Sequence, residues 1–203
     1  MTLTLVIDTA LAAQSLALLD GEHVVAARHG VIGRGHAEAL MPALAALLDE
    51  AGATPDRILV DVGPGSFTGL RIGIAAARAL GLAWQVPVSG YASLSLIAAP
   101  VFAAHPDVRL AVVAEAGRGL LYVQLLDRDL VAHAAVVALD AEAVARWLPP
   151  GVAVAGPGAE RVAGARVLAS AWPDARDSHL LTAGASALPP VPHYVSAPDA
   201  VAA

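Results

Sequence analysis

The sequence of 203 residues predicts an α/β protein built from two halves that share one order of elements. In the first half, short apolar runs typical of strands alternate with helical patterns. A turn of the form Gly-Pro-Gly-small follows a predicted strand in each half, at residues 63–66 and again at residues 156–159. The repeated turn and the repeated order predict a duplicated fold, with one unit at residues 1–104 and a second at residues 105–203.

The elements expected in the first half follow from apolar spacing and from turn residues. The longest helical pattern, at residues 36–51, ends before Gly52, and Pro42 within it predicts either a kink or a helix that becomes regular only after it. Three strands, a helix, a strand, a helix, a strand and a helix are the order of a ribonuclease H-like unit. The expected strands are residues 3–8, 15–19, 23–28, 58–62 and 87–89, and the expected helices are residues 36–51, 68–83 and 91–103.

The second half repeats this plan with fewer elements. Strands are expected at residues 108–115, 120–127, 131–137 and 152–155, and a helix at residues 141–148. Prolines at positions 189, 190, 192 and 198 predict an irregular tail. We therefore expect a reduced copy of the first unit.

Composition limits the possible functions. Apolar residues make up 57% of the chain and charged residues 15%, without an uninterrupted apolar run of about 18 residues, so a protein–protein interface is favoured over a membrane segment. The net charge of −6 and the scattered Lys and Arg argue against direct nucleic-acid binding. Cysteine is absent and the seven histidines lack metal-ligand spacing, so no metal and no cofactor are expected, and a cytoplasmic location is compatible.

The glycine-rich run at residues 63–73 lies where a strand turns into a helix, a place that suits an anion. Its spacing excludes the Walker phosphate loop, the dinucleotide fingerprint and the nucleophile elbow. Two interpretations of this run stay open. Ser66 or Thr68 caps the helix, or the turn contacts phosphate, in which case the weak nucleotide candidates are Asp8, Thr9, Gly65 and Ser66.

Small residues recur every four positions in the following helix, at Gly69, Gly73, Ala77 and Gly81. Because each helical glycine costs about 1 kcal/mol relative to alanine, such a row predicts the close approach of another backbone. That backbone belongs either to the same domain or to a partner chain.

The run Gly-Pro-Gly-Ser-Phe-Thr-Gly-Leu-Arg-Ile-Gly at residues 63–73 resembles the hallmark of the TsaB (YeaZ) family. The opening Leu-Val-Ile-Asp-Thr at residues 5–9, the helix start at residues 36–42 and the segment at residues 87–94 support the resemblance, which covers residues 3–100. The second half is less similar. Glu115-Ala116-Gly117 stands where the family often has Asp-Ala-Arg, and Ser196 stands where an Arg is common.

The resemblance implies a sugar kinase/Hsp70/actin-like (ASKHA) fold of two ribonuclease H-like halves. It also implies a non-catalytic dimerization subunit for TsaD, the subunit that transfers a threonylcarbamoyl group to N6 of the adenosine beside the tRNA anticodon. Metal-binding histidines of TsaD should correspond to residues 91–96, which contain no histidine here. Further implied partners are the ATPase TsaE and, when the chain is alone, a second copy.

In this family the first two helices form the interface with TsaD, so residues 36–51 and 68–83 are its expected counterparts. The predicted interface residues are His36, Leu40, Leu44, Leu47, Gly69, Arg71, Gly73 and Ala77. On this reading Gly73→Leu should weaken the heterodimer by steric exclusion.

Two other classes compete with the scaffold. An ATP-binding enzyme of the kinase-like superfamily would use the glycine-rich turn and a carboxylate on Mg²⁺, with Asp8, Asp61 and Glu115 as candidates by location. A peptidase is disfavoured because the sequence shows neither a Ser/His/Asp arrangement nor a His-Glu-x-x-His motif.

Overall fold

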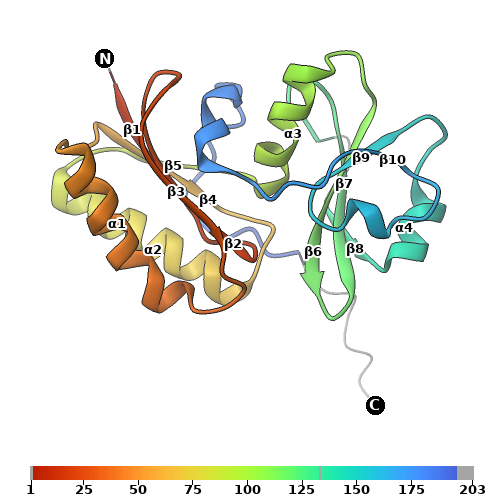
Figure 1. The fold of residues 1–203 in the computed structure, drawn as a ribbon, viewed down its shortest axis with the longest axis horizontal. Helices are drawn as coiled ribbons and strands as arrows, with labels where there is room; N and C mark the ends of the chain where they lie inside the picture. The colour runs from red at the N-terminus through yellow and green to blue at the C-terminus, as the bar shows by residue number, and fades with distance from the viewer. Residues whose placement is uncertain (1, 133, 196–203) are drawn as a thin grey trace.

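Two five-stranded mixed sheets form the framework of the computed structural model (Figure 1). It describes residues 2–132 and 134–195. Ser196 and the end of the predicted tail lie outside the described residues. In the first sheet the strand order is β3-β2-β1-β4-β5, with β1 antiparallel to β2 and parallel to β4. These strands are β1 (Leu3–Asp8), β2 (Ala13–Asp20), β3 (His23–Val31), β4 (Arg57–Asp61) and β5 (Val88–Tyr91).

Helices α1 (His36–Ala51) and α2 (Phe67–Trp84) lie side by side on one face of this sheet (Figure 1). Helix α1 extends through Pro42, so a helix that becomes regular only after this residue is wrong. The helix stops at Gly52, where a φ of 59° turns the chain and the backbone N–H bonds to the Leu48 carbonyl.

The second sheet repeats the topology of the first. Its order, β10-β9-β6-β7-β8, again places the first strand of the unit between the second and the fourth, with the same antiparallel and parallel pairs. The short 3₁₀ turn η1 (Ala159–Arg161) stands where the first unit has α2. The other elements are β6 (Leu110–Gly117), β7 (Leu120–Leu126), β8 (Val137–Leu139), α4 (Ala141–Trp147), β9 (Ala153–Ala155) and β10 (Arg166–Ala169).

The repeated turn has one backbone conformation in both units. Gly63 follows β4 with a φ of 113°, and Gly156 follows β9 with a φ of 112°, a region that favours glycine. Together with the shared strand order, this confirms the predicted fold class: two ribonuclease H-like halves, the second reduced, in an actin-like arrangement.

The expected strand at residues 131–137 is wrong. Of the described residues in that range, only Val137 enters β8, because the Asp127 carboxylate accepts bonds from the backbone N–H groups of Asp129 and Val131 and closes a turn there. Strand β10 and the 3₁₀ helix η2 (Ala175–Leu180) are additional elements that the spacing did not predict.

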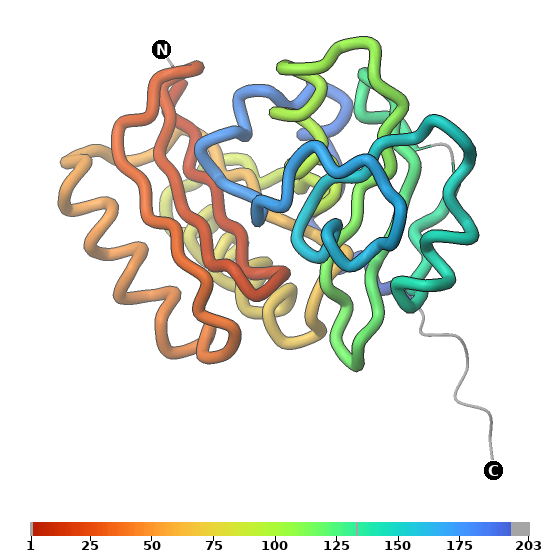
Figure 2. Tube along the Cα trace, turned by 45° about the vertical axis from the view of Figure 1, so that its right-hand side comes forward, coloured from red at the N-terminus to blue at the C-terminus, as the bar shows by residue number. Residues whose placement is uncertain are grey.

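Packing crosses the predicted division between residues 104 and 105 in both directions. Helix α3 (Ser93–Ala104) shares the hydrophobic core of the second sheet, where Ile97 and Phe102 pack with Val112. In return, η2 packs on the first sheet, and the C-terminal segment lies between the N-terminal strands and the second lobe (Figure 2). The division into units of residues 1–104 and 105–203 stays a prediction.

Candidate functional site

The glycine-rich loop between β4 and α2 is bonded to its own chain. Ser66 is the N-cap of α2, and its hydroxyl accepts a bond from the Gly69 N–H at 2.9 Å, which confirms one of the two capping residues considered. The Ser66 N–H donates to the Ala10 carbonyl at 2.7 Å, and a Cβ on Gly65 would overlap the same carbonyl. The Ser66 amide and the close approach of Gly65 therefore hold the loop against the turn that follows β1.

Two buried aspartates lie behind this loop, at the ends of the parallel strands β1 and β4. Asp8 accepts a bond from the Tyr91 hydroxyl at 3.0 Å, and Asp61 accepts bonds from the Gly63 N–H at 2.7 Å and the Ser93 hydroxyl at 2.8 Å. Both aspartates are almost completely buried. The pair fastens the loop and the start of α3 to the centre of the first sheet.

Burial raises the pKa of both carboxyl groups. The pKa of Asp8 rises from 3.8 to about 6, mainly because the charged form loses its hydration. For the same reason, and because Asp8 is close, the pKa of Asp61 is well above its ordinary value. Oδ2 of Asp61 is buried without a hydrogen-bond partner. A proton on Asp61 would supply the donor that this oxygen needs toward Asp8, so near neutral pH we expect the pair to share one proton.

The four nucleotide candidates gather around this loop, but three of them are turned toward the protein interior. Asp8 and Thr9 are buried, and the Thr9 hydroxyl donates to the Gly69 carbonyl at 2.8 Å. Gly65 packs on Ala10, and the exposed Ser66 uses its hydroxyl as the helix cap. A phosphate would have to displace these internal bonds, and the nucleotide role stays a prediction.

Of the three carboxylates considered for Mg²⁺, Asp8 and Asp61 come together, but Glu115 does not join them. Glu115 lies on β6 with its oxygen 4.0 Å from Arg161, on a different sheet from the Asp8–Asp61 pair. Among the described residues, no group of three or more His, Cys, Asp or Glu side chains is placed to hold a metal ion.

The row of small residues on α2 faces the chain's own sheet. A Cβ on Gly69 would overlap the Thr9 carbonyl, and one on Gly73 would lie 2.5 Å from the Thr9 Oγ1. Ala77 is fully buried in the first core. Within this chain β1 is the backbone that these residues admit, and a role of Gly69, Gly73 and Ala77 at a partner interface stays a prediction. Gly73→Leu would disrupt this packing before it reached a partner.

The residues predicted for the interface on α1 are also internal. Leu40, Leu44 and Leu47 are 1% exposed or less and pack against the first sheet, and His36 is 7% exposed. The helical spacing of these leucines indicates the face of α1 that packs on the core, as an apolar stripe on a helix usually does. Of the eight predicted interface residues, only Arg71 is exposed.

The opposite surface of the two helices, here called the outer face, is apolar and exposed. Leu82 is 83% exposed and Met41 is 53% exposed. The other exposed residues of the two helices include small ones, Ala37, Ala45, Ala75, Ala79 and Ala83, and charged ones, Glu38, Asp49, Glu50, Arg71 and Arg78. This is the surface that the sequence analysis missed, although the residues directly after the buried leucines of α1, about 100° around the helix, would have pointed to it.

An aromatic and cationic cluster borders the outer face at the start of α2. The rings of Phe67 and Tyr194 stack with centroids 5.2 Å apart, and the Arg71 guanidinium lies 3.6 Å from the centroid of the Phe67 ring. The Arg71 Nε donates to the Tyr194 hydroxyl at 2.9 Å. Phe67 is 55% exposed, so the cluster adds aromatic surface to the end of the helix.

Comparison with known proteins agrees with this geometry. The family model described as TsaD, tRNA N6-adenosine threonylcarbamoyltransferase, matches residues 18–169, more than half of the chain. The TsaB protein of Bacillus subtilis is 34% identical over 124 residues, which cover 60% of this chain and 53% of that protein. YeaZ from Pseudomonas aeruginosa superposes with a TM-score of 0.73 at 28% identity, covering 89% of this chain and 90% of that one. The chain belongs to the TsaB (YeaZ) family.

The part of the chain that matches its relatives is smaller in sequence than in structure. The TsaB of Escherichia coli is 32% identical over 132 residues, or 62% of this chain and 55% of that protein. The chain thus matches little more than half the length of its TsaB relatives in sequence, while the fold of YeaZ extends over nearly all of it. Within the part of the chain that the structure describes, no helix is long and apolar enough to cross a membrane.

Proposed function

We propose that this chain is the non-catalytic subunit that binds and activates a TsaD-like catalytic subunit for threonylcarbamoylation of N6 of the tRNA adenosine beside the anticodon. The observation that carries the proposal is the outer face of α1 and α2, where Leu82 and Met41 are exposed among small side chains. Exposed large apolar residues on adjacent helices are typical of interfaces between subunits.

Two further features support a scaffold. The Asp8–Asp61 pair is buried and bonded within the chain, and residues 91–96 contain no histidine. The family of the chain and the names of its relatives support the pathway, tRNA threonylcarbamoyladenosine biosynthesis.

The remaining partners and the location are part of the same proposal. In the absence of TsaD we expect the outer face to pair with its copy, and in the full complex we expect the ATPase TsaE to join. The net charge of −6 supports tRNA binding by another subunit, with all of them in the cytoplasm.

Light scattering of the chain, alone and mixed with the TsaD homologue of the same genome, tests the proposal. We expect a homodimer that converts to a heterodimer. Leu82→Asp should weaken the heterodimer at least about tenfold, because it places a charge in a desolvated contact. Val131→Asp is the matched control, since Val131 is 58% exposed on the other lobe.

Equal affinity of both variants for TsaD would remove the outer face from the interface. Failure of the parent chain to associate with TsaD, together with ATP turnover by the isolated chain, would overturn the scaffold and favour the kinase-like enzyme.

A further inference from the structure

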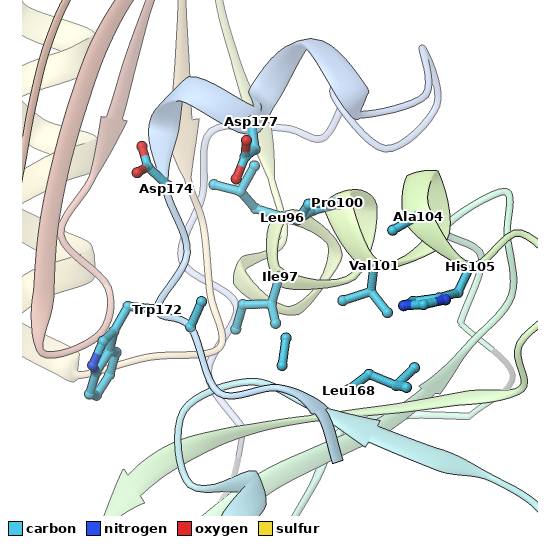
Figure 3. A pocket seen from close by; sticks show the side chains of 12 residues that line it. Leu96, Ile97, Pro100, Val101, Ala104, His105, Leu168, Trp172, Asp174 and Asp177 are labelled. Atoms are coloured by element: carbon cyan, nitrogen blue, oxygen red, sulfur yellow. The ribbon is translucent and has the colours of Figure 1, made fainter. Parts of the chain in front are cut away.

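A cavity of about 240 Å³ lies between α3, β10 and η2, away from the outer face (Figure 3). Ile97 and Val101 of α3 line it on one side and Leu168 of β10 on the other. The carboxylates of Asp174 and Asp177 stand at the η2 end. The cavity therefore combines an apolar body with acidic groups at one end.

The two carboxylates differ in their partners. Asp174 is occupied, since it accepts bonds from Arg176 at 2.9 Å and from the Ser15 hydroxyl at 3.4 Å, and lies 3.8 Å from His29. Asp177 makes no side-chain hydrogen bond or ion pair with the described residues, and in Figure 3 its carboxylate points toward α3.

Asp177 is thus a partly buried anion without a hydrogen-bonded or ion-paired cation among the described residues, and the charges of His179, Arg176 and His29 stabilise it only without direct contact. Burial, and then the charge of Asp174, raise the pKa of Asp177 above its ordinary value. The free energy of such a group decreases when a cation donates a charge-assisted hydrogen bond to it. The net charge of −6 also raises the local concentration of cations near the chain.

We propose that this cavity binds a small organic cation, an ammonium or guanidinium group carried on a compact apolar body. The charged group donates to Asp177, and the apolar body packs between Val101 and Leu168. His105 limits the cavity at the end opposite to Asp177 (Figure 3), which restricts the ligand to a short body. This site is separate from the proposed TsaD interface and does not depend on it.

Titration of the full chain with three probes, followed by the amide NMR signals of α3 and η2, tests the proposal. Phenethylamine combines charge and apolar body, 3-phenylpropanoate reverses the charge, and methylammonium lacks the body. We expect saturable shifts with phenethylamine at a Kd on the order of 1 mM, and none with the other two probes at the same concentrations.

Two variants test the residues. Asp177→Asn should weaken phenethylamine binding at least about tenfold, while Asp49→Asn, which removes an exposed carboxylate on α1, should leave it unchanged. Ala104→Phe fills the rim from an exposed position of α3 and should also abolish binding. Absence of saturable shifts with phenethylamine at about 10 mM, equal binding of the anion, or full affinity in both Asp177→Asn and Ala104→Phe would overturn the proposal.

Discussion

The buried Asp8 carboxyl makes the stability of the chain depend on pH, and Asp8→Asn should remove part of that dependence. The folded-state pKa of Asp8 is about 6, against an ordinary value of 3.8. Between these two values the folded chain holds a proton that the unfolded chain releases. The contribution of Asp8 to the free energy of unfolding therefore falls as the pH rises from about 4 through about 6, and stays low above that.

The size of this effect follows from the two pKa values. A rise from 3.8 to about 6 corresponds to on the order of 3 kcal/mol of lost stability at neutral pH. Asp8→Asn also weakens the bond from the Tyr91 hydroxyl, but that loss changes little with pH. The difference between low and neutral pH therefore reports the titration of the Asp8–Asp61 pair, because Asp8→Asn also removes the charge that helps to raise the pKa of Asp61.

Urea unfolding at a series of pH values from about 4 to about 8 measures this difference. We expect the parent chain to lose stability more steeply than Asp8→Asn, with the two curves diverging by about 2–3 kcal/mol. Asp49→Asn, at an exposed position on α1, should follow the parent. Parallel curves for the parent and Asp8→Asn would refute the reasoning, because the carboxyl would then have an ordinary pKa in the folded chain.

Three further substitutions probe the same framework. Gly69→Ala should lower the free energy of unfolding by at least about 2 kcal/mol in urea titrations, because its Cβ would overlap the Thr9 carbonyl; unchanged stability would show that α2 can move away from β1. Ser15→Ala should cost about 1–3 kcal/mol, since the Ala175 N–H, 2.8 Å from the Ser15 hydroxyl, loses its acceptor, and hydrogen exchange at residue 175 should speed up. Burial lowers the pKa of His36, so protonation of this side chain opposes folding and the parent chain loses stability in acid. His36→Leu should therefore reduce the loss of unfolding free energy below about pH 6.5. An equal loss in the parent and in His36→Leu would contradict this.

Much of the fold could be predicted because the apolar patterns are regular. The expected helix at residues 36–51 has the observed bounds of α1, and the Gly-Pro-Gly turn identified the repeat. The position of Asp61 beside Asp8 was also within reach, since the parallel register pairs Ile7 with Val60 and therefore places the next residues of both strands together. An aspartate at the end of each of two predicted parallel strands can be recognised in the sequence, and it predicts that the two carboxyl groups lie close together.

The orientation of the helices was harder to predict. A row of small residues on α2 indicates that another backbone lies close to the helix. The row is the same whether that backbone is β1 or a partner chain, so the sequence does not distinguish the two. The contact between Arg71 and Tyr194 joins residues 123 positions apart and follows from no local pattern. Strand β10 is short and half exposed, so its apolar residues did not form a recognisable run.

The crossing of the C-terminal segment has a consequence for synthesis of the chain. Ala175 packs in a core cluster with Val6 and Leu59, and His193 donates its backbone N–H to the Val62 carbonyl at 2.7 Å. The first sheet is translated early, yet these contacts form only after residues 175–193 have emerged from the ribosome. We expect the nascent N-terminal lobe to bind chaperones, or to remain open to proteases, until that segment reaches it.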